Sequence, residues 1–213
     1  MAHVLVVGAS RGIGLLTVEA LLSAGHDVRA FARGAQSIAR SDPRLEKRAG
    51  DALRRADVEA ALEGVDAVVE VLGLPPGPTY LTGTTLFSRA TRILVDAMKA
   101  KGVQRLIAVT GIGAGDSRGH GGPLYDLLLF PIVLKRIYDD KDVQEQIIRA
   151  SGLEWTILRP GILTDEPVRA PARVLPDPKD WHAGKVARAA VAQAIVDELA
   201  EGRHIGRTPL VIR

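Results

Sequence analysis

Short apolar runs rich in β-branched residues alternate with longer segments of helical periodicity along almost the whole chain. Most of the runs are apolar throughout rather than at every second position, which is typical of strands covered on both faces of a sheet. The pattern predicts strands at residues 3–7, 27–32, 45–49, 67–71, 105–109, 155–158 and 210–212. It predicts helices near residues 13–24, 54–62, 86–100, 124–150 and 186–200. Glycines 25, 64, 102 and 152 are expected to end helices, each shortly before the next strand.

This alternation predicts right-handed βαβ units in an α/β fold, and therefore one doubly wound parallel sheet with helices on both faces, the Rossmann arrangement. No repeat or linker interrupts the pattern, so we expect residues 1–213 to form a single domain. A proline-rich segment at 163–181 follows the sixth strand, where open sheets place loops around a ligand. The apolar run 127–134, interrupted by Pro131, predicts either a buried, kinked helix or an oligomer contact.

A glycine-rich motif, Gly8-Ala9-Ser10-Arg11-Gly12-Ile13-Gly14, directly follows the first strand and opens the first helix. The first glycine permits a tight turn, the second lets the backbone approach a pyrophosphate, and the third lets the helix pack close to the sheet. The helix start adds free N–H groups and a partial positive charge, so Ser10, Arg11 and Ile13 are expected near the same phosphates. The spacing differs from the commonest fingerprint, and an ordinary βα turn is the plain alternative.

The same residues also spell G-x-S-x-G, the nucleophile elbow of hydrolases, with Ser10 as the nucleophile. Only seven residues precede Gly8, which leaves no upstream strand or oxyanion loop. The dinucleotide interpretation is therefore favoured over the hydrolase.

The end of the second strand bears on which dinucleotide is bound. Proteins that prefer NAD usually place a carboxylate there to hold the ribose 2′-OH, but this strand ends Ala32-Arg33-Gly34. Arg33 and Arg11 together could hold a 2′-phosphate by charge-assisted bonds, although a solvated surface role is equally open to Arg33 alone. NADP(H) is therefore predicted in preference to NAD(H).

Two further strand ends supply candidate cofactor contacts. Asp51, followed by Ala52, could accept a hydrogen bond from the adenine amino group, or it could cap the next helix. Leu72 and Gly73 end the fourth strand, where a bare glycine would let a ribose lie against the backbone; a simple turn is the alternative.

Composition narrows the remaining chemistry. A net charge of +3, from 28 basic and 25 acidic residues, is too mild to favour nucleic acid as a partner. The chain contains no cysteine and no asparagine, which excludes thiolate nucleophiles, cysteine metal sites and N-glycosylation. Five scattered histidines lack metal-binding spacing, so no metal is expected. The start lacks a signal-peptide pattern and no apolar run could span a bilayer, so we expect a cytoplasmic protein without a membrane partner.

Several motifs follow one another along the chain. They are the glycine loop, Gly50-Asp51, Val109-Thr110-Gly111-Ile112-Gly113, Tyr138-Asp139-Asp140-Lys141 with Glu145, and the segments 151–161 and 188–192. In this order they resemble the short-chain dehydrogenase/reductase superfamily, specifically its atypical NAD(P)H-binding branch. That branch includes flavin and biliverdin reductases, NmrA-like redox sensors and benzylic ether reductases.

The chain departs from the typical enzymes of that superfamily at their catalytic pair. Their Tyr-x-x-x-Lys motif places the two residues four apart, whereas Tyr138 and Lys141 are three apart. Tyr125 stands roughly where a typical catalytic tyrosine would follow the fifth strand, yet residue 129 is leucine. The activity of the typical enzymes is therefore not implied.

The resemblance to the benzylic ether reductases implies a role for Lys141. A lysine at the matching place lies beside the nicotinamide there, where an ammonium can orient the cofactor and donate a proton. The alternative is a surface lysine paired with Glu145 or Asp142. Tyr138 is a second catalytic candidate, with simple packing as its alternative.

Two more places complete the predicted site. Thr110 could hydrogen-bond a substrate, or only tie down a turn. In similar proteins, backbone groups just after the proline of Arg159-Pro160-Gly161 hold the nicotinamide carboxamide, so Pro160, Gly161 and Ile162 are candidate contacts.

Together these features predict an enzyme, an NADPH-dependent reductase that transfers hydride to a small carbonyl, quinone, flavin or imine-like acceptor. We expect the acceptor between residues 113–122 and the segment 163–181. A non-catalytic NADP(H)-binding redox sensor and a nucleotide-sugar epimerase-like protein stay as alternatives. The expected partner is a small molecule, and the sequence leaves open whether the protein is a monomer or a dimer.

Overall fold

The computed structural model describes residues 1–75 and 77–213, without the side chains of Leu81 and Leu129. Its centre is an eight-stranded sheet in which β8 runs antiparallel to β10 and the other neighbouring strands are parallel. In sheet order the strands are β3 (Leu45–Ala49), β2 (Asp27–Ala32), β1 (His3–Val7), β4 (Ala67–Glu70), β5 (Arg105–Val109), β6 (Glu154–Pro160), β10 (Leu210–Ile212) and β8 (Arg173–Leu175). The first six follow the Rossmann order, which confirms the predicted fold class.

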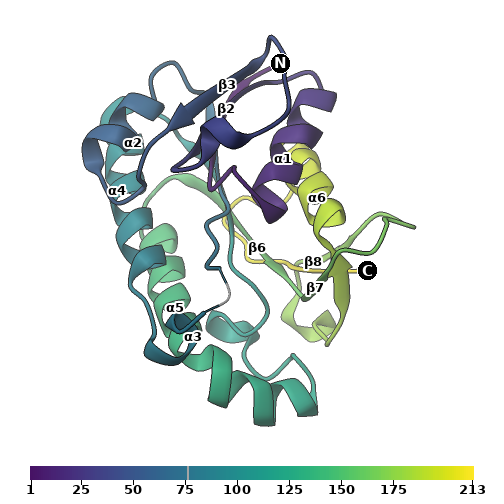
Figure 1. The fold of residues 1–213 in the computed structure, drawn as a ribbon. Helices are drawn as coiled ribbons and strands as arrows, with labels where there is room; N and C mark the ends of the chain where they lie inside the picture. Colours follow the sequence, from purple (N-terminus) through teal and green to yellow (C-terminus); the bar gives the residue numbers. More distant parts are fainter. Residues whose placement is uncertain (76) are drawn as a thin grey trace.

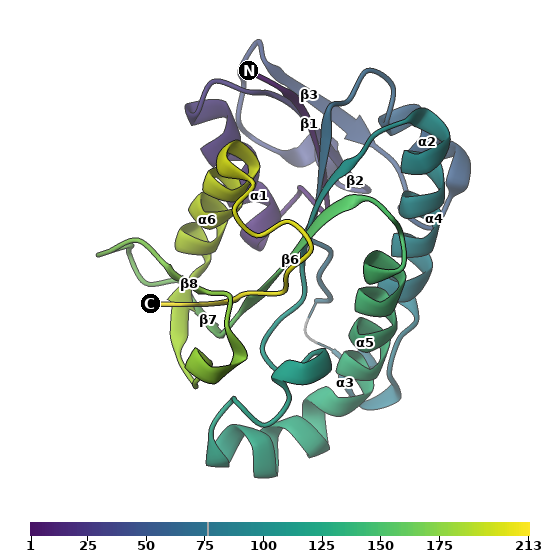
Figure 2. The ribbon, with the colours of Figure 1, turned by 180° about the vertical axis from the view of Figure 1, so that it is seen from behind.

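Helices cover both faces of the sheet (Figures 1 and 2). On one face lie α1 (Gly12–Ser23) and α6 (Arg188–Glu201), and on the other α2 (Arg55–Ala61), α4 (Leu86–Lys101) and α5 (Lys135–Arg149). The position of β1 between the two cores explains why its residues 4–7 are all apolar. Val4 and Val6 belong to the core under α1 and α6, whereas Leu5 and Val7 belong to the core under the other three helices. A strand buried on both faces needs an apolar side chain at every position.

Most of the predicted elements are confirmed. Five of the seven predicted strands have the observed bounds, while β4 is one residue shorter and β6 three residues longer than expected. The four glycines expected to end helices all have positive φ angles. Predicted helix starts and ends lie within one residue of the observed ones for α1, α2 and α4.

The prediction fails around the proline-rich segment. Residues 185–187 form a strand, β9 (Lys185–Ala187), so α6 begins at Arg188 rather than at residue 186. β9 pairs in parallel with β7 (Ile162–Thr164), and β8 also lies in this region. Each of these strands has three residues, too few for periodicity to reveal, and their pairing depends on neighbours distant in sequence.

The segment predicted as one long helix, 124–150, is divided. Tyr125–Leu134 forms a π-helical stretch that contains Pro131, and α5 continues from Lys135. One alternative for this apolar stretch was a buried, kinked helix. The stretch is not buried, since Leu124, Leu127 and Ile132 are at least 70% exposed. None of the helices in the described part of the chain is long and apolar enough to cross a membrane.

Candidate functional site

A cavity of about 850 Å³ opens at the carboxyl ends of the parallel strands, within the range typical of ligand-binding clefts. Most of the predicted site residues line it: Gly8, Ser10, Arg11, Gly12, Ile13, Arg33, Asp51, Ala52, Leu72, Gly73, Thr110, Tyr138, Lys141 and Pro160. Gly14, Gly161 and Ile162 do not line it. The tertiary structure thus brings together residues from six strand ends and from α5.

The glycine loop leaves the start of α1 open to an anion. Gly8 has a φ of +93°, and a Cβ there would lie 2.7 Å from the Val71 carbonyl oxygen, so only glycine fits. α1 begins at Gly12 after an extended Arg11 whose side chain makes no capping hydrogen bond. Space is also open beside Gly12, since a Cβ there would meet no atom within 4 Å. Free N–H groups and open space at a helix start fit the pyrophosphate of a dinucleotide.

Gly14 has the packing role that its position predicts, rather than a place on the cavity wall. A Cβ at Gly14 would overlap the Gly8 carbonyl oxygen. We expect Gly14→Ala to lower the free energy of unfolding by about 1–3 kcal/mol, because the helix must move away from the loop. Urea denaturation measures this, with Gly73→Ala as the control because a Cβ at Gly73 meets nothing within 4 Å. Equal stability of the two variants would contradict the packing role.

Arg11 and Arg33 both lie on the cavity wall and are exposed. Neither side chain makes an ion pair or a hydrogen bond within the residues that the structure describes. A Cβ at Gly34 would lie 3.8 Å from the Ser10 Cβ, so the second-strand end and the glycine loop are neighbours. Two unpaired guanidinium groups at neighbouring positions suit an anionic group at this end of the cavity.

Asp51 closes a turn rather than capping a helix. Its Oδ1 accepts from the Leu53 N–H at 2.9 Å, and its own N–H donates to Asp57 Oδ2 at 3.0 Å. The residue that precedes α2 is Arg54, so the capping alternative is wrong by three positions. Asp51 still lines the cavity, and its contact with adenine stays a prediction.

Lys141 lies at the other end of the cavity, with only 8% of its surface exposed. Its Nζ sits 4.1 Å from the centre of the Phe87 ring, a cation–π contact. Glu145 and Asp142, the expected partners of a surface lysine, bind arginines instead. Burial lowers the pKa of Lys141 to about 8, because charge is disfavoured away from water.

Tyr138 lines the cavity beside Lys141, but its hydroxyl lies against Gly111, where a Cβ would come within 2.5 Å of it. Burial holds the pKa of Tyr138 well above its ordinary value, so this phenol stays protonated. Tyr125 in turn donates to the Ile112 carbonyl oxygen at 2.9 Å and lies off the cavity wall. The two tyrosines therefore pack and anchor the 111–112 backbone.

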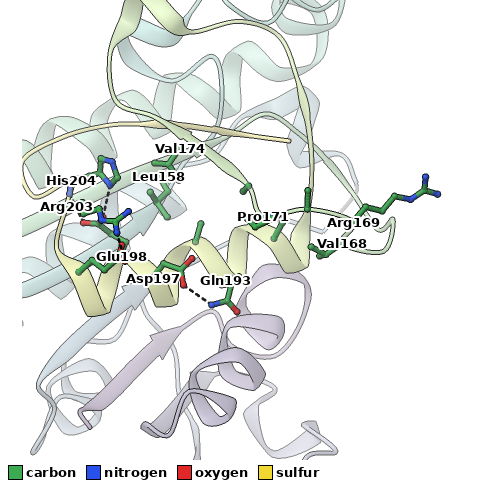
Figure 3. Close-up of a pocket in the computed structure, with 15 residues that line it drawn as sticks. Leu158, Val168, Arg169, Pro171, Val174, Gln193, Asp197, Glu198, Arg203 and His204 are labelled. Atoms are coloured by element: carbon green, nitrogen blue, oxygen red, sulfur yellow. Dashed lines mark hydrogen bonds and ion pairs between the residues drawn. The ribbon is translucent and has the colours of Figure 1, made fainter.

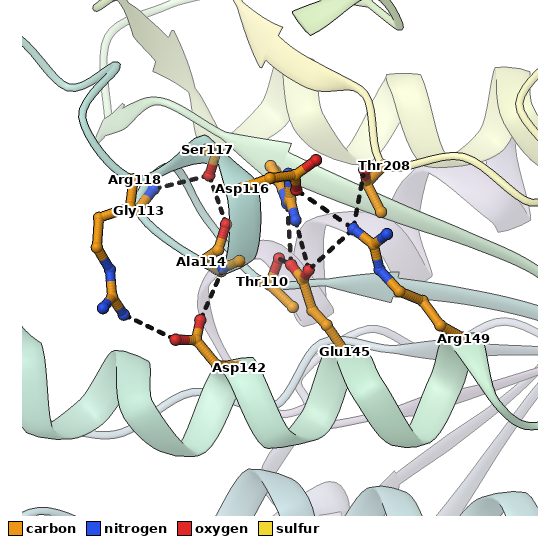
Figure 4. Close-up of polar contacts among 12 residues, drawn as sticks. Thr110, Gly113, Ala114, Asp116, Ser117, Arg118, Asp142, Glu145, Arg149 and Thr208 are labelled. Atoms are coloured by element: carbon orange, nitrogen blue, oxygen red, sulfur yellow. Dashed lines mark hydrogen bonds and ion pairs between the residues drawn. The ribbon is translucent and has the colours of Figure 1, made fainter.

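Thr110 belongs to a buried ion-pair cluster (Figure 4). Its hydroxyl donates to Glu145 Oε1 at 2.8 Å, so it can offer a substrate only its lone pairs. Arg159, fully buried, donates to the two oxygens of Glu145 at 2.9 and 2.5 Å and lies 2.7 Å from Asp116. This cluster joins β5, β6, α5 and the loop that follows β5.

The backbone N–H groups after Pro160 are already hydrogen-bonded within the protein. The Gly161 N–H donates to the Val211 carbonyl oxygen and the Ile162 N–H to the Gly184 carbonyl oxygen, each at 2.9 Å. Both N–H donors are engaged in strand pairing, and neither residue lines the cavity. A carboxamide contact through these N–H groups is therefore not open, and a contact through the carbonyl oxygens stays a prediction. Leu163, one residue further, does line the cavity.

The acceptor side also differs from expectation. Among the described lining residues is Leu163 of the 163–181 segment, but none of residues 113–122. That loop is held away by Asp142, which accepts from the Gly115 N–H at 2.7 Å and pairs with Arg118 at 2.7 Å (Figure 4). The wall near Lys141 comes instead from Leu74, Pro75, Thr79, Tyr80, Thr84, Leu86, Phe87, Leu134 and Ile137. His120, in the displaced loop, packs edge-on against Trp181.

Glu70 is a buried residue near this site that sequence reasoning missed. It ends β4, is fully buried, and accepts from Thr91 Oγ1 at 2.6 Å. Burial raises the pKa of Glu70 to about 7. The sequence feature that could have revealed Glu70 is a lone carboxylate inside an apolar run. A strand covered on both faces offers no water to solvate such a charge.

A second cavity, of about 640 Å³, lies between α6 and the loop before β8 (Figure 3). Its charged groups are already paired: Glu198 with His204, Glu201 with Arg203, and Asp197 with Gln193. Arg169 points away from it in Figure 3. Within the described residues no three His, Asp or Glu side chains gather as a metal site. No histidine lines the larger cavity either, so Ser10 lacks the base that a hydrolase would require.

Comparisons with known proteins agree with this geometry. An uncharacterized chloroplastic protein of Arabidopsis thaliana is 31% identical over 207 residues, which are 93% of this chain and 72% of that protein. A Bacillus subtilis protein named as an uncharacterized sugar epimerase is 28% identical over 145 residues, 68% of this chain and 62% of its own length. The solved structure of ChuY, an anaerobillin reductase from Escherichia coli O157:H7, is 26% identical with a TM-score of 0.75, covering 99% of this chain and 96% of that one.

A family model described as NAD(P)H-binding matches residues 8–202, from the first glycine of the loop to the end of α6. The match confirms the branch that the sequence motifs resemble. The chain therefore belongs to the NAD(P)H-binding family of Rossmann-fold proteins.

Proposed function

We propose that the protein is an NADPH-dependent reductase that acts on a small, planar carbonyl, quinone, flavin or imine-like acceptor. The observation that carries this proposal is the buried ammonium of Lys141 at the end of the glycine-loop cavity. Lys141 makes no hydrogen bond or ion pair with any described residue, so its N–H donors are available to a bound molecule. The reductase activity of ChuY supports the same class of reaction.

The residues present fit a dinucleotide whose pyrophosphate lies at the start of α1. When bound, NADPH would supply the hydride. Lys141 holds a proton at neutral pH, since its pKa is about 8, and donates that proton from Nζ to the acceptor oxygen or nitrogen. Leu134, Ile137 and Phe87 provide apolar walls that exclude water from this end of the cavity.

We further propose that Arg11 and Arg33 select NADPH over NADH. Arg33→Ser is expected to weaken NADPH binding about tenfold and to leave NADH binding unchanged, because only NADPH carries a 2′-phosphate for the guanidinium to contact. Fluorescence titration with both cofactors measures this. Arg40→Ser, which removes an exposed arginine paired with Asp42, serves as the control. An equal loss for both cofactors would show that Arg33 does not read the 2′-phosphate.

A redox sensor that binds NADP(H) without turnover is the second candidate. It is favoured by the Tyr138 phenol, which packs against Gly111 and stands three rather than four residues before Lys141, so it does not reproduce the tyrosine of the typical enzymes. A panel of quinones, flavins, aldehydes and imines separates the two functions. Steady oxidation of NADPH by any of them excludes the sensor, whereas tight binding without oxidation across the panel contradicts the reductase.

A further inference from the structure

Glu70 stands at the end of β4, between Val7 of β1 and Ala108 of β5 in the sheet. Its carboxylate points to the face covered by α2, α4 and α5, where Oε1 accepts from Thr91 Oγ1 of α4. Its other oxygen, Oε2, is buried and has no partner among the described residues. A buried carboxylate oxygen without a hydrogen bond is costly, so the charged form of Glu70 requires a compensating group nearby.

The packing of α4 against α5 shows which group lies close enough to compensate the charge of Glu70. Gln144 of α5 donates to Thr91 Oγ1 at 3.1 Å, so the two helices meet at the Glu70 carboxylate. One turn earlier on each helix lie Phe87 and Lys141, which are themselves in contact through the ring face at 4.1 Å. The Lys141 ammonium and the Glu70 carboxylate therefore share one buried space between β4, α4 and α5.

The other charged groups around Lys141 are already engaged. On α5, Glu145 binds Arg159 and Arg149, while Asp140 accepts from the N–H groups of Phe87 and Ser88 at the start of α4. The α4 side chains that face the lysine, Phe87 and Thr91, are uncharged. Among the described residues, Glu70 is the nearby carboxylate that has no cationic or backbone partner of its own.

We propose that Glu70 is a positioning residue that acts through Lys141: its buried carboxylate is the counter-ion that keeps the proton on the Lys141 ammonium. The shifts in the two groups agree with this arrangement. Burial raises the pKa of Glu70 to about 7 and lowers that of Lys141 to about 8, and each charge favours the other. Near neutral pH the pair is thus poised to hold both charges. Without Glu70 the ammonium would keep only the weaker influence of Glu145 and Asp140, which are engaged with other partners. The effect of this pairing on catalysis rests on the proposed reductase function, whereas the charge coupling between Glu70 and Lys141 does not.

The test follows the charge of Lys141 directly, without cofactor or acceptor. The protein has seven lysines, so ¹³Cε-lysine labelling gives a small set of NMR signals, of which Lys141→Met identifies one. In Glu70→Gln, which keeps the shape of the side chain, the titration of that signal is expected to move to lower pH by at least one unit, a tenfold loss of proton affinity. Glu70→Asp should retain most of the wild-type value. Glu19→Gln, which removes an exposed carboxylate on α1, should leave it unchanged.

An unmoved Lys141 titration in folded Glu70→Gln overturns the proposal. If that variant does not fold, the reciprocal measurement decides, because coupling between two sites is mutual. In Lys141→Met the ¹³Cδ signal of Glu70 should titrate at higher pH than in the wild type, and an unchanged value also overturns the proposal. Should the titrations shift while Lys141→Met turns over normally, the reductase role of Lys141 fails and the pairing with Glu70 stands.

Discussion

Replacing Lys141 by methionine is expected to lower kcat of the proposed reductase by about 100-fold or more, the usual scale of a lost general acid. Methionine matches the length of lysine and can pack on the Phe87 ring, so the cavity wall keeps its shape. The variant loses only the proton donor beside the acceptor. NADPH affinity should stay within a few-fold, because the glycine loop and the two arginines lie at the other end of the cavity.

Steady-state kinetics and fluorescence titration together check this result. Lys135→Met is the matched control, since Lys135 lies on the same helix but is exposed and paired with Asp139. In the wild type, kcat/KM should fall as the pH rises above about 8, where Lys141 loses its proton. Turnover that is unchanged in Lys141→Met would remove this lysine from the mechanism.

Arg159→Met is expected to lower the free energy of unfolding by about 3–5 kcal/mol, the cost of removing one partner of a buried ion pair. The guanidinium is fully buried and stacks on Trp181, with its centre 5.3 Å from the ring. Its loss leaves Glu145, which is 2% exposed, charged and without its main partner. Thr110 is bonded to the same carboxylate, and Asp116 of the loop after β5 is paired with Arg159 itself, so the carboxyl end of β5 and this loop should loosen first.

Chemical denaturation measures the loss, and Arg149→Met provides the control. Arg149 contacts the same two carboxylates, Asp116 and Glu145, but its side chain is 42% exposed. An exposed pair contributes little, so this variant should lose about 1 kcal/mol or less. Similar losses in the two variants would show that the burial of Arg159 is not what makes the cluster important.

The sequence pattern was sufficient for the sheet and for the phosphate-binding end of the site. In β1 the four buried residues, 4–7, are all apolar because both faces are covered, and that requirement is local and visible. The glycine loop is also readable, because the backbone geometry at Gly8 and the packing at Gly14 admit no side chain. Nearly all residues predicted there line the observed cavity.

The other end of the site depended on contacts between residues far apart in sequence. Whether the N–H groups of Gly161 and Ile162 are free was decided by β10 and by Gly184, which pair with them. The position of the 113–122 loop was decided by Asp142 and by the Arg159 cluster.

The sequence by itself determined the Rossmann sheet, its helix ends and its open anion site, because each follows from periodicity or from glycine geometry over a few neighbouring residues. Only the tertiary structure decided that Lys141 is buried beside Glu70 and that Thr110 is committed to Glu145. Burial and charge pairing depend on which helices pack over which strand ends, and no local pattern encodes that arrangement.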